Sequence, residues 1–196
     1  MRLRVLVLLA ILWGVGVSSL SHAAIDVREE GYSANQIIHS RYFTIYIEEG
    51  ADLEEVARKL AVPASIRAVI KNQPSFSNSL QFQDQLDTLF LAVSEIMDLR
   101  LKKFHSEIKI CKDAASLSQV AMNLFGRPIQ PRAFYVVALD TLYVDAESVT
   151  MNVLGHELSH AVQSHYFVVP PPEKIQEVLA GFVEYELRKY TGTLPK

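Results

Sequence analysis

Hydrophobic positions along this chain follow two periods, one of two residues and one of three to four, which predict strands interleaved with helices. The strand-like runs are rich in β-branched and aromatic side chains, and proline or glycine separates several of the helix-like runs. The predicted strands cover residues 41–47, 108–111, 133–138 and 141–144, and the predicted helices cover 51–60, 64–71, 76–101, 114–125, 148–165 and 173–190. Residues 24–37 are polar and mixed and predict a loosely ordered lead-in. This order predicts a single α+β domain over residues 24–196.

The first 23 residues have a different character. Two arginines precede an almost uninterrupted apolar run at residues 5–17, and Ser21-His22-Ala23 places small residues before Ala24. This layout is typical of a cleavable secretory signal and predicts export to a bacterial periplasm or the exterior, with no stable membrane anchor after cleavage. The alternative is a membrane-tethered protein, because the run can be extended to about 16–18 residues. Residues 20–24 contain no cysteine, which excludes a lipoprotein anchor.

Charge and cysteine content narrow the functional classes. Without residues 1–23 the chain has 17 basic and 22 acidic side chains, a formal net charge of −5. It has no arginine-rich tract, so no nucleic-acid partner is expected. Cys111 is the only cysteine. It ends an alternating strand-like segment, which favours a small core residue over a reactive thiol.

The sequence His156-Glu157-Leu158-Ser159-His160 lies in the middle of a predicted helix. Residues four apart on a helix are neighbours, so the two imidazoles can bind one Zn²⁺. Glu157 is turned by about 100° from His156 and flanks the metal, where a general base for an activated water is needed. Met151, Leu154, Leu158, Ala161 and Val162 share the opposite side of the helix and are expected to contact the sheet. The pattern indicates a zinc-dependent hydrolase.

A third metal ligand is predicted on the last helix. Glu177 follows His160 by 17 residues, and Pro170-Pro171-Pro172 ends the first helix and returns the chain toward it. Gly181, one turn after Glu177, is expected to let the two helices approach closely. Ile175, Leu179, Phe182 and Val183 form the predicted apolar side of this helix. The alternative for Glu177 is a surface carboxylate near a helix N-terminus.

His156-Glu-x-x-His160 followed by Glu177 resembles the gluzincin branch of the zinc metallopeptidases, most specifically over residues 133–190. The resemblance implies a small zincin-like domain, in which a mixed sheet packs on the active-site helix beside a second, ligand-bearing helix. It also implies a His₂Glu zinc site of His156, His160 and Glu177, with Glu157 as general base and acid. Residues 141–144 correspond to the edge strand that lines the substrate in the family.

The chain departs from the family pattern at two positions. Val178 stands where many relatives have glycine, and Gly181 stands where others carry an acidic residue that orients a histidine. Glu184 is the candidate for that orienting role, and a helical ion pair with Arg188 is its simpler interpretation. The metzincin pattern requires glycine at 163 and histidine at 166, whereas this chain has Gln163 and Tyr166.

The predicted function is an exported zinc peptidase that hydrolyses peptide bonds in a peptide or protein substrate. Activity is expected to fall below about pH 5–6, as protons compete for the histidine ligands. The oxyanion-stabilising residue is left open among Tyr143, Tyr166, Tyr185 and His165, as are substrate preference and oligomeric state. Two alternatives stand: a catalytically silent zinc-binding or protein-interaction domain, and a scaffold without metal. His39 and His105 are expected to be ordinary histidines.

Overall fold

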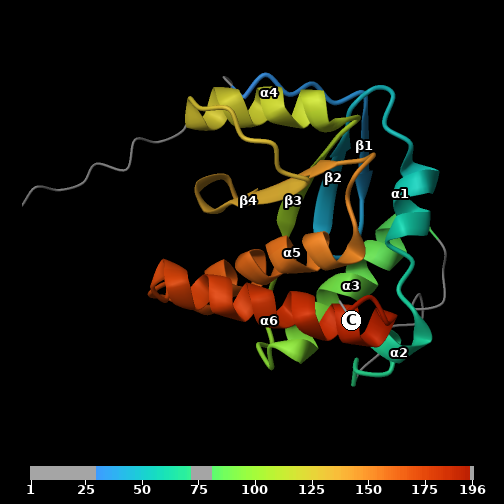
Figure 1. Cartoon of the computed structure of the whole chain (residues 1–196), viewed down its shortest axis with the longest axis vertical. Coiled ribbons are helices and arrows are strands. Elements are labelled where there is room, and N and C mark those ends of the chain that lie inside the picture. The colour runs from blue at the N-terminus through green and yellow to red at the C-terminus, as the bar shows by residue number, and fades with distance from the viewer. Residues whose placement is uncertain (1–29, 72–80, 195–196) are drawn as a thin grey trace, which may run out of the picture.

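A mixed five-stranded sheet forms the centre of the molecule, seen in a computed structural model that describes residues 30–71 and 81–194 (Figure 1). In spatial order the strands are β1 (Gln36–His39), β2 (Phe43–Ile47), β3 (Ser106–Cys111), β5 (Thr141–Asp145) and β4 (Ala133–Val136). The central strands β2, β3 and β5 are parallel, and β1 and β4 pair antiparallel at the two edges. The predicted signal segment, residues 1–23, lies outside the described residues.

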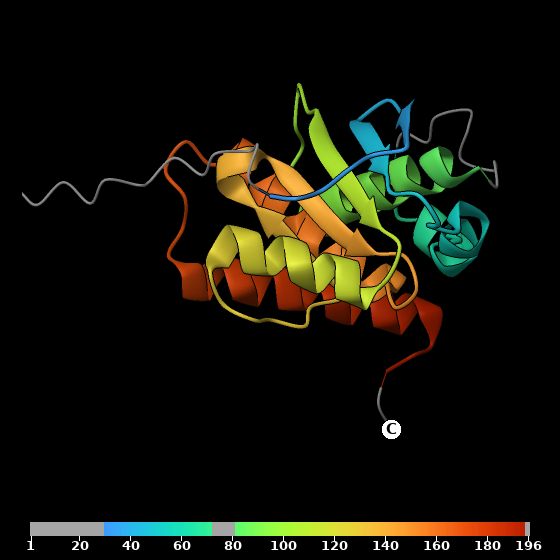
Figure 2. The same ribbon diagram turned by 90° about the horizontal axis from the view of Figure 1, so that it is seen from above.

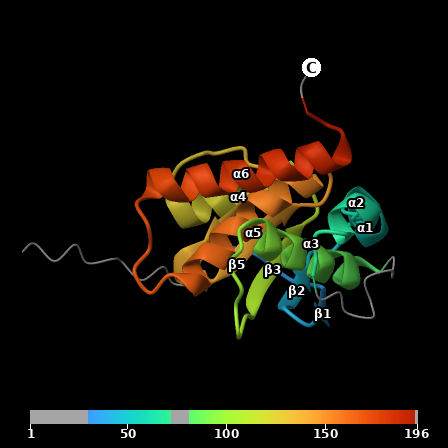
Figure 3. The same ribbon diagram turned by 90° about the horizontal axis from the view of Figure 1, so that it is seen from below.

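Helices cover both faces of this sheet (Figures 1 and 2). They are α1 (Leu53–Lys59), α2 (Ala64–Arg67), α3 (Phe82–Ile96), α4 (Ala114–Phe125), α5 (Met151–Tyr166) and α6 (Glu173–Thr191). Helix α4 covers one face, α3 and α5 lie on the other, and α6 runs along the outer side of α5 (Figure 3). The predicted α+β class is therefore confirmed. Among the described helices, none combines the length and the apolar character needed to cross a bilayer.

The two faces of the sheet enclose separate cores, which explains why β5 is buried on both sides. Leu142 and Val144 belong to the larger core beneath α3 and α5, whereas Tyr143 belongs to the smaller core beneath α4. Cys111 lies in the same smaller core and is fully buried. Burial raises the pKa of its thiol to about 12, so the prediction of an inert core cysteine agrees with the structure.

The lead-in at residues 24–37 is more ordered than predicted. Residues 36–39 form β1, whose four-residue pattern is too short to reveal a strand before its partner β2 is known. Before it, the buried Glu30 forms an ion pair with the buried Lys109 and accepts a hydrogen bond from Tyr143. These contacts fix the start of the described chain to the sheet.

Two further expectations are corrected by the structure. The helix expected at residues 76–101 begins at Phe82 and ends at Ile96, because Asp98 adopts a left-handed backbone with φ of 52°; residues 76–80 fall within the part not described. Residues 141–144 do not form an edge strand, because β5 is covered by β3 on one side and by β4 on the other. The edge beside α5 is β4, which was expected only as its hairpin partner.

The contact between α5 and α6 depends on a glycine that the hydrophobic pattern does not single out. A Cβ atom at Gly155 would lie 2.2 Å from Cδ1 of Leu187, so the absence of a side chain there lets the helices approach. At Gly181, by contrast, a Cβ atom would meet no atom within 4 Å, so the role expected for Gly181 was wrong. The buried face of α5 is as predicted.

The buried face of α6 agrees with the expected one only in part, since Val183 is buried as predicted but other members of the expected face are not. It consists of Ala180, Val183 and Leu187, while Ile175 and Phe182 remain 48% and 46% exposed. The face with Ala180 carries a smaller side chain and allows closer packing on α5. A count of large apolar residues does not reveal this preference.

The two glycines allow a matched test of helix packing. Gly181→Ala is expected to stabilise the protein by about 0.5–1 kcal/mol, since it improves helix propensity without creating a contact. Gly155→Ala gains the same propensity but must displace Leu187, so it should be less stable than Gly181→Ala by about 1–3 kcal/mol. Urea unfolding of the three proteins measures both values. Equal stabilisation by the two substitutions would contradict the packing described.

Candidate metal centre

Two imidazoles project from adjacent turns of α5. The helix begins after Thr150, whose hydroxyl caps it by accepting the Val153 N–H, and it runs unbroken through the site. The Nε2 atoms of His156 and His160 lie 3.4 Å apart. The side chains of His156 and His160 are 23% and 14% exposed, so both imidazoles are partly accessible to solvent.

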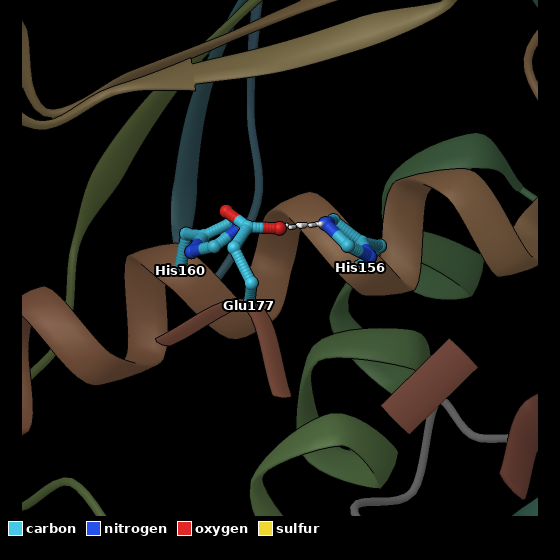
Figure 4. Close-up of side chains that lie close together, drawn as sticks. All are labelled: His156, His160 and Glu177. Carbon is cyan, nitrogen blue, oxygen red and sulfur yellow. Dashed lines mark hydrogen bonds and ion pairs between the residues drawn. The ribbon is translucent and has the colours of Figure 1, made fainter. Parts of the chain in front are cut away.

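Glu177 comes to the same point from the first turns of α6 (Figure 4). Its Oε2 lies 3.5 Å from Nε2 of His156, and its Oε1 lies 3.4 Å from Nε2 of His160. With one ligand atom taken from each residue, the three atoms lie within 4.8 Å of one another. The chain thus places Glu177 beside both imidazoles and not alone on the surface, although its side chain is still 55% exposed.

The donor set fits a zinc ion by chemistry and by size. Two imidazoles and a carboxylate are a common ligand set of catalytic zinc. Ligands about 2.0–2.1 Å from a tetrahedral ion are about 3.3–3.4 Å from each other. The Nε2–Nε2 separation of 3.4 Å lies close to this value, and so do the distances of 3.5 and 3.4 Å from the two imidazoles to Glu177, although these two distances end on different oxygens of its carboxylate. With one oxygen of Glu177 as ligand, the three ligand atoms lie within 4.8 Å of one another, so the side chains must draw closer together to bind one ion.

Glu184 occupies the position of an outer partner to His156. Its Oε2 is 3.6 Å from Nδ1 of His156, while its Oε1 accepts hydrogen bonds of 3.0 and 2.7 Å from Nε and Nη2 of Arg188. The two interpretations given to Glu184 are thus compatible, since Arg188 holds the carboxylate beside the imidazole. A carboxylate near the second ring nitrogen favours the orientation in which Nε2 is free to bind a metal.

Glu157 points from the same helix toward the edge strand β4. Its Oε2 accepts a hydrogen bond of 3.1 Å from the backbone N–H of Tyr135. The pKa of this carboxyl is raised to about 7, chiefly by burial; the Tyr135 hydrogen bond lowers the pKa and the nearby Glu177 raises it. A carboxyl that titrates near neutral pH is suited to accept and return a proton. No sequence pattern indicates the Tyr135 contact, because its donor is a backbone atom of a strand.

The electrostatics of His160 favour a metal-binding form. Burial lowers the pKa of its imidazole, the Glu177 carboxylate raises it, and the neighbouring His156 lowers it. Burial is the largest of these effects. His160 is therefore held toward the neutral state, which is the state that can donate a lone pair to a metal.

The four candidates for oxyanion stabilisation lie in different surroundings. Tyr143 is excluded, because its side chain is fully buried on the opposite face of the sheet and bonds to Glu30. His165 lies 2.9 Å from Asp140 and packs on the ring of Phe104. Tyr166 and Tyr185 are 46% and 50% exposed, and no geometry selects between them. His39 and His105 lie near Thr44, away from this centre.

No family model, curated protein or solved structure matches this chain. Any function must therefore be argued from the residues of the metal centre and their geometry.

The raised pKa of Glu157 predicts a pH dependence for the metal-free protein. A carboxyl whose pKa rises from 4.5 to about 7 on folding contributes stability below pH 4.5 that is lost as the pH rises to 7. Relative to Glu157→Gln, the wild type should lose about 3 kcal/mol of unfolding free energy over this interval, at 1.36 kcal/mol per pH unit.

Urea unfolding in the presence of a chelator, at intervals from pH 4.5 to 8, measures this difference. Glu173→Gln is the control, because Glu173 is exposed in the first turn of α6 and its substitution should give a constant difference. A constant difference for Glu157→Gln as well would contradict the assignment of a buried, proton-exchanging carboxyl.

Proposed function

We propose that this chain is an exported zinc-dependent peptidase with a zincin-like domain, related in its site to the gluzincins. The observation that carries the proposal is the convergence of His156, His160 and Glu177, whose ligand atoms lie within 4.8 Å of one another, with Glu157 next to His156 on the same helix. The leader-like composition of residues 1–23 supports export. A mixed sheet that packs on α5, with α6 alongside, agrees with the architecture that the resemblance implies.

Each residue of the centre has a distinct task in this proposal. When bound, zinc supplies Lewis-acid chemistry, lowering the pKa of a water and polarising a substrate carbonyl. His156, His160 and Glu177 would hold the ion, and a site with three protein ligands would keep a coordination position for water. Glu157 accepts a proton from the attacking water and returns it to the departing amine nitrogen. The Tyr135 N–H holds the Glu157 carboxylate in place during both transfers.

The free edge of β4 indicates a peptide as the substrate. Among the described strands, β4 pairs with β5 only, so no strand lies along its other side. The Tyr135 N–H points outward to Glu157, and the strand alternation turns the backbone of Ala133 in the same direction. An extended peptide can hydrogen-bond along such an edge as an added strand, which would bring a scissile carbonyl toward α5.

The catalytically silent zinc domain is less well supported. Structural zinc sites are closed by four protein ligands, whereas the described residues bring together three histidine, cysteine, aspartate or glutamate ligands at this point. A buried carboxyl with a pKa near 7 beside the ligands also has no use in a purely structural site. Both observations favour a catalytic centre.

Removal of the third ligand tests metal binding. Glu177→Ala is expected to weaken zinc affinity by more than about 100-fold, beyond the 10–100-fold typical of an outer partner. Zinc content by mass spectrometry and competition with a chromogenic chelator measure the loss. Glu173→Ala, four residues earlier on α6, should retain zinc as the wild type does. Unchanged zinc content in Glu177→Ala would show that the ligand assignment is wrong.

Removal of the base tests catalysis separately from metal binding. Glu157→Gln keeps an acceptor for the Tyr135 N–H and all three ligands, so zinc content should stay the same. Cleavage of a peptide library should fall by about 10²–10⁴-fold, the usual contribution of general acid–base catalysis. If the zinc-loaded wild type cleaves no peptide, the silent-domain alternative is correct. If the variant cleaves peptides as well as the wild type does, another residue is the base.

A further inference from the structure

A buried glutamine lies next to the metal centre without any task in the chemistry described so far. Gln163 follows His160 by three residues and His156 by seven, so the three residues share one side of α5. It is 1% exposed, although glutamine is rarely buried so completely. Its position in the interface between α5 and α6 suggests that it is retained for a reason other than core packing.

One end of this side chain contacts the backbone that carries the third ligand. Nε2 of Gln163 donates a hydrogen bond of 3.3 Å to the carbonyl of Gln176, the residue immediately before Glu177. The side chain of Gln176 in turn donates a bond of 2.8 Å to the carbonyl of Pro171 in the turn between the helices. The side-chain amides of Gln163 and Gln176 thus connect α5, the proline turn and the first turn of α6. They fix the position of the backbone that carries Glu177 relative to α5.

The other end of the side chain is unused. Oε1 of Gln163 is buried and has no hydrogen-bond partner among the described residues. A buried acceptor without a partner destabilises the folded state, and an apolar side chain of the same length would avoid this cost. Stability alone therefore favours methionine or leucine at this position, and the glutamine requires another explanation.

His160 offers a donor that matches this acceptor. Its Nε2 faces Glu177 and His156, so its Nδ1 is turned away from them (Figure 4) and makes no hydrogen bond with any described residue. Side chains on a helix incline toward its N-terminus, which brings Gln163 back over the turn that carries His160. A metal-binding imidazole normally donates its second N–H to an outer partner, as Glu184 provides for His156.

We propose that Gln163 is the positioning residue of the metal centre, which orients His160 through Oε1 and holds the Glu177 turn through Nε2. The hydrogen bond from Nδ1–H of His160 to Oε1 forms when Nε2 is committed to the metal. This inference rests on the proposed zinc site. It assigns to the Gln163 amide the placement of two of the three zinc ligands, His160 and Glu177.

The test compares zinc affinity with the stability of the metal-free protein. Gln163→Met keeps the length and burial but removes both hydrogen bonds, so zinc affinity should fall by about 10–100-fold. The melting temperature of the metal-free protein should stay equal or rise, because the unpartnered acceptor is lost. Gln163→Glu keeps an acceptor for His160 and loses the donor to Gln176, so its affinity should lie between those of wild type and Gln163→Met.

A control and a spectroscopic signal separate positioning from packing. Ser159→Ala removes another fully buried polar group of α5, whose hydroxyl bonds to the carbonyl of His156, and it should leave zinc affinity within about twofold. In zinc-loaded wild type, ¹H–¹⁵N spectra of the imidazoles should show a slowly exchanging Nδ1–H of His160, and Gln163→Met should lose it.

The outcomes are distinguishable from failure of the proposed function. If wild type binds Zn²⁺ and Gln163→Met binds it equally well, the inference is overturned and the zinc site stands. A parallel loss of affinity and metal-free stability would assign Gln163 to packing and would also overturn it. If Gln163→Met does not fold, two other measurements decide. The inference is overturned if Gln163→Glu binds zinc as tightly as wild type and the Nδ1–H of His160 in zinc-loaded wild type exchanges rapidly with solvent. Absence of zinc binding by wild type would remove both proposals.

Discussion

The close approach of α5 and α6 is the constraint on which the candidate site depends. Neither helix carries a complete ligand set, since α5 supplies two imidazoles and α6 supplies the carboxylate. Contact at Gly155 and Leu187 sets the distance between the helices, and the turn at residues 167–172 sets their direction. Glu177 needs this packing most, because its own side chain is more than half exposed.

The charges at the centre are arranged so that the protein tolerates them before any cation binds. Three carboxylates and two imidazoles lie within two helical turns, and repulsion among the acids would loosen the packing. Arg188 offsets Glu184, while burial shifts Glu157 toward its neutral form. Glu177 stays near solvent, where its charge costs little. The site can therefore contain one carboxyl that tends to be neutral, Glu157, beside one that is largely exposed, Glu177.

The sheet contacts the candidate site in two ways, through one of its faces and through its edge strand β4. One face packs against α5 and supports the ligands, while the edge strand β4 positions Glu157 through a backbone N–H. The opposite face holds Lys109, Glu30 and Tyr143 in a buried polar cluster that fixes the start of the described chain. A backbone donor in a sheet is stiffer than a side chain, so it restricts the Glu157 carboxylate more firmly than a side-chain donor would.

Local sequence determined the parts of this protein that depend on residues a few positions apart. The spacing of His156, Glu157 and His160, the buried face of α5 and the inert Cys111 all follow from helix or strand periodicity, which acts over one or two turns. Which strand forms the sheet edge, which glycine admits the neighbouring helix and which face of α6 is buried depend on partners distant in the chain. Glu177 belongs to both groups, since its spacing suggested a ligand and the packing of α6 on α5 brought its oxygens to the imidazoles. Tertiary structure alone decided the contacts of the Tyr135 N–H and the Gln163 amide, because a backbone N–H and a buried amide leave no periodic signal in a sequence.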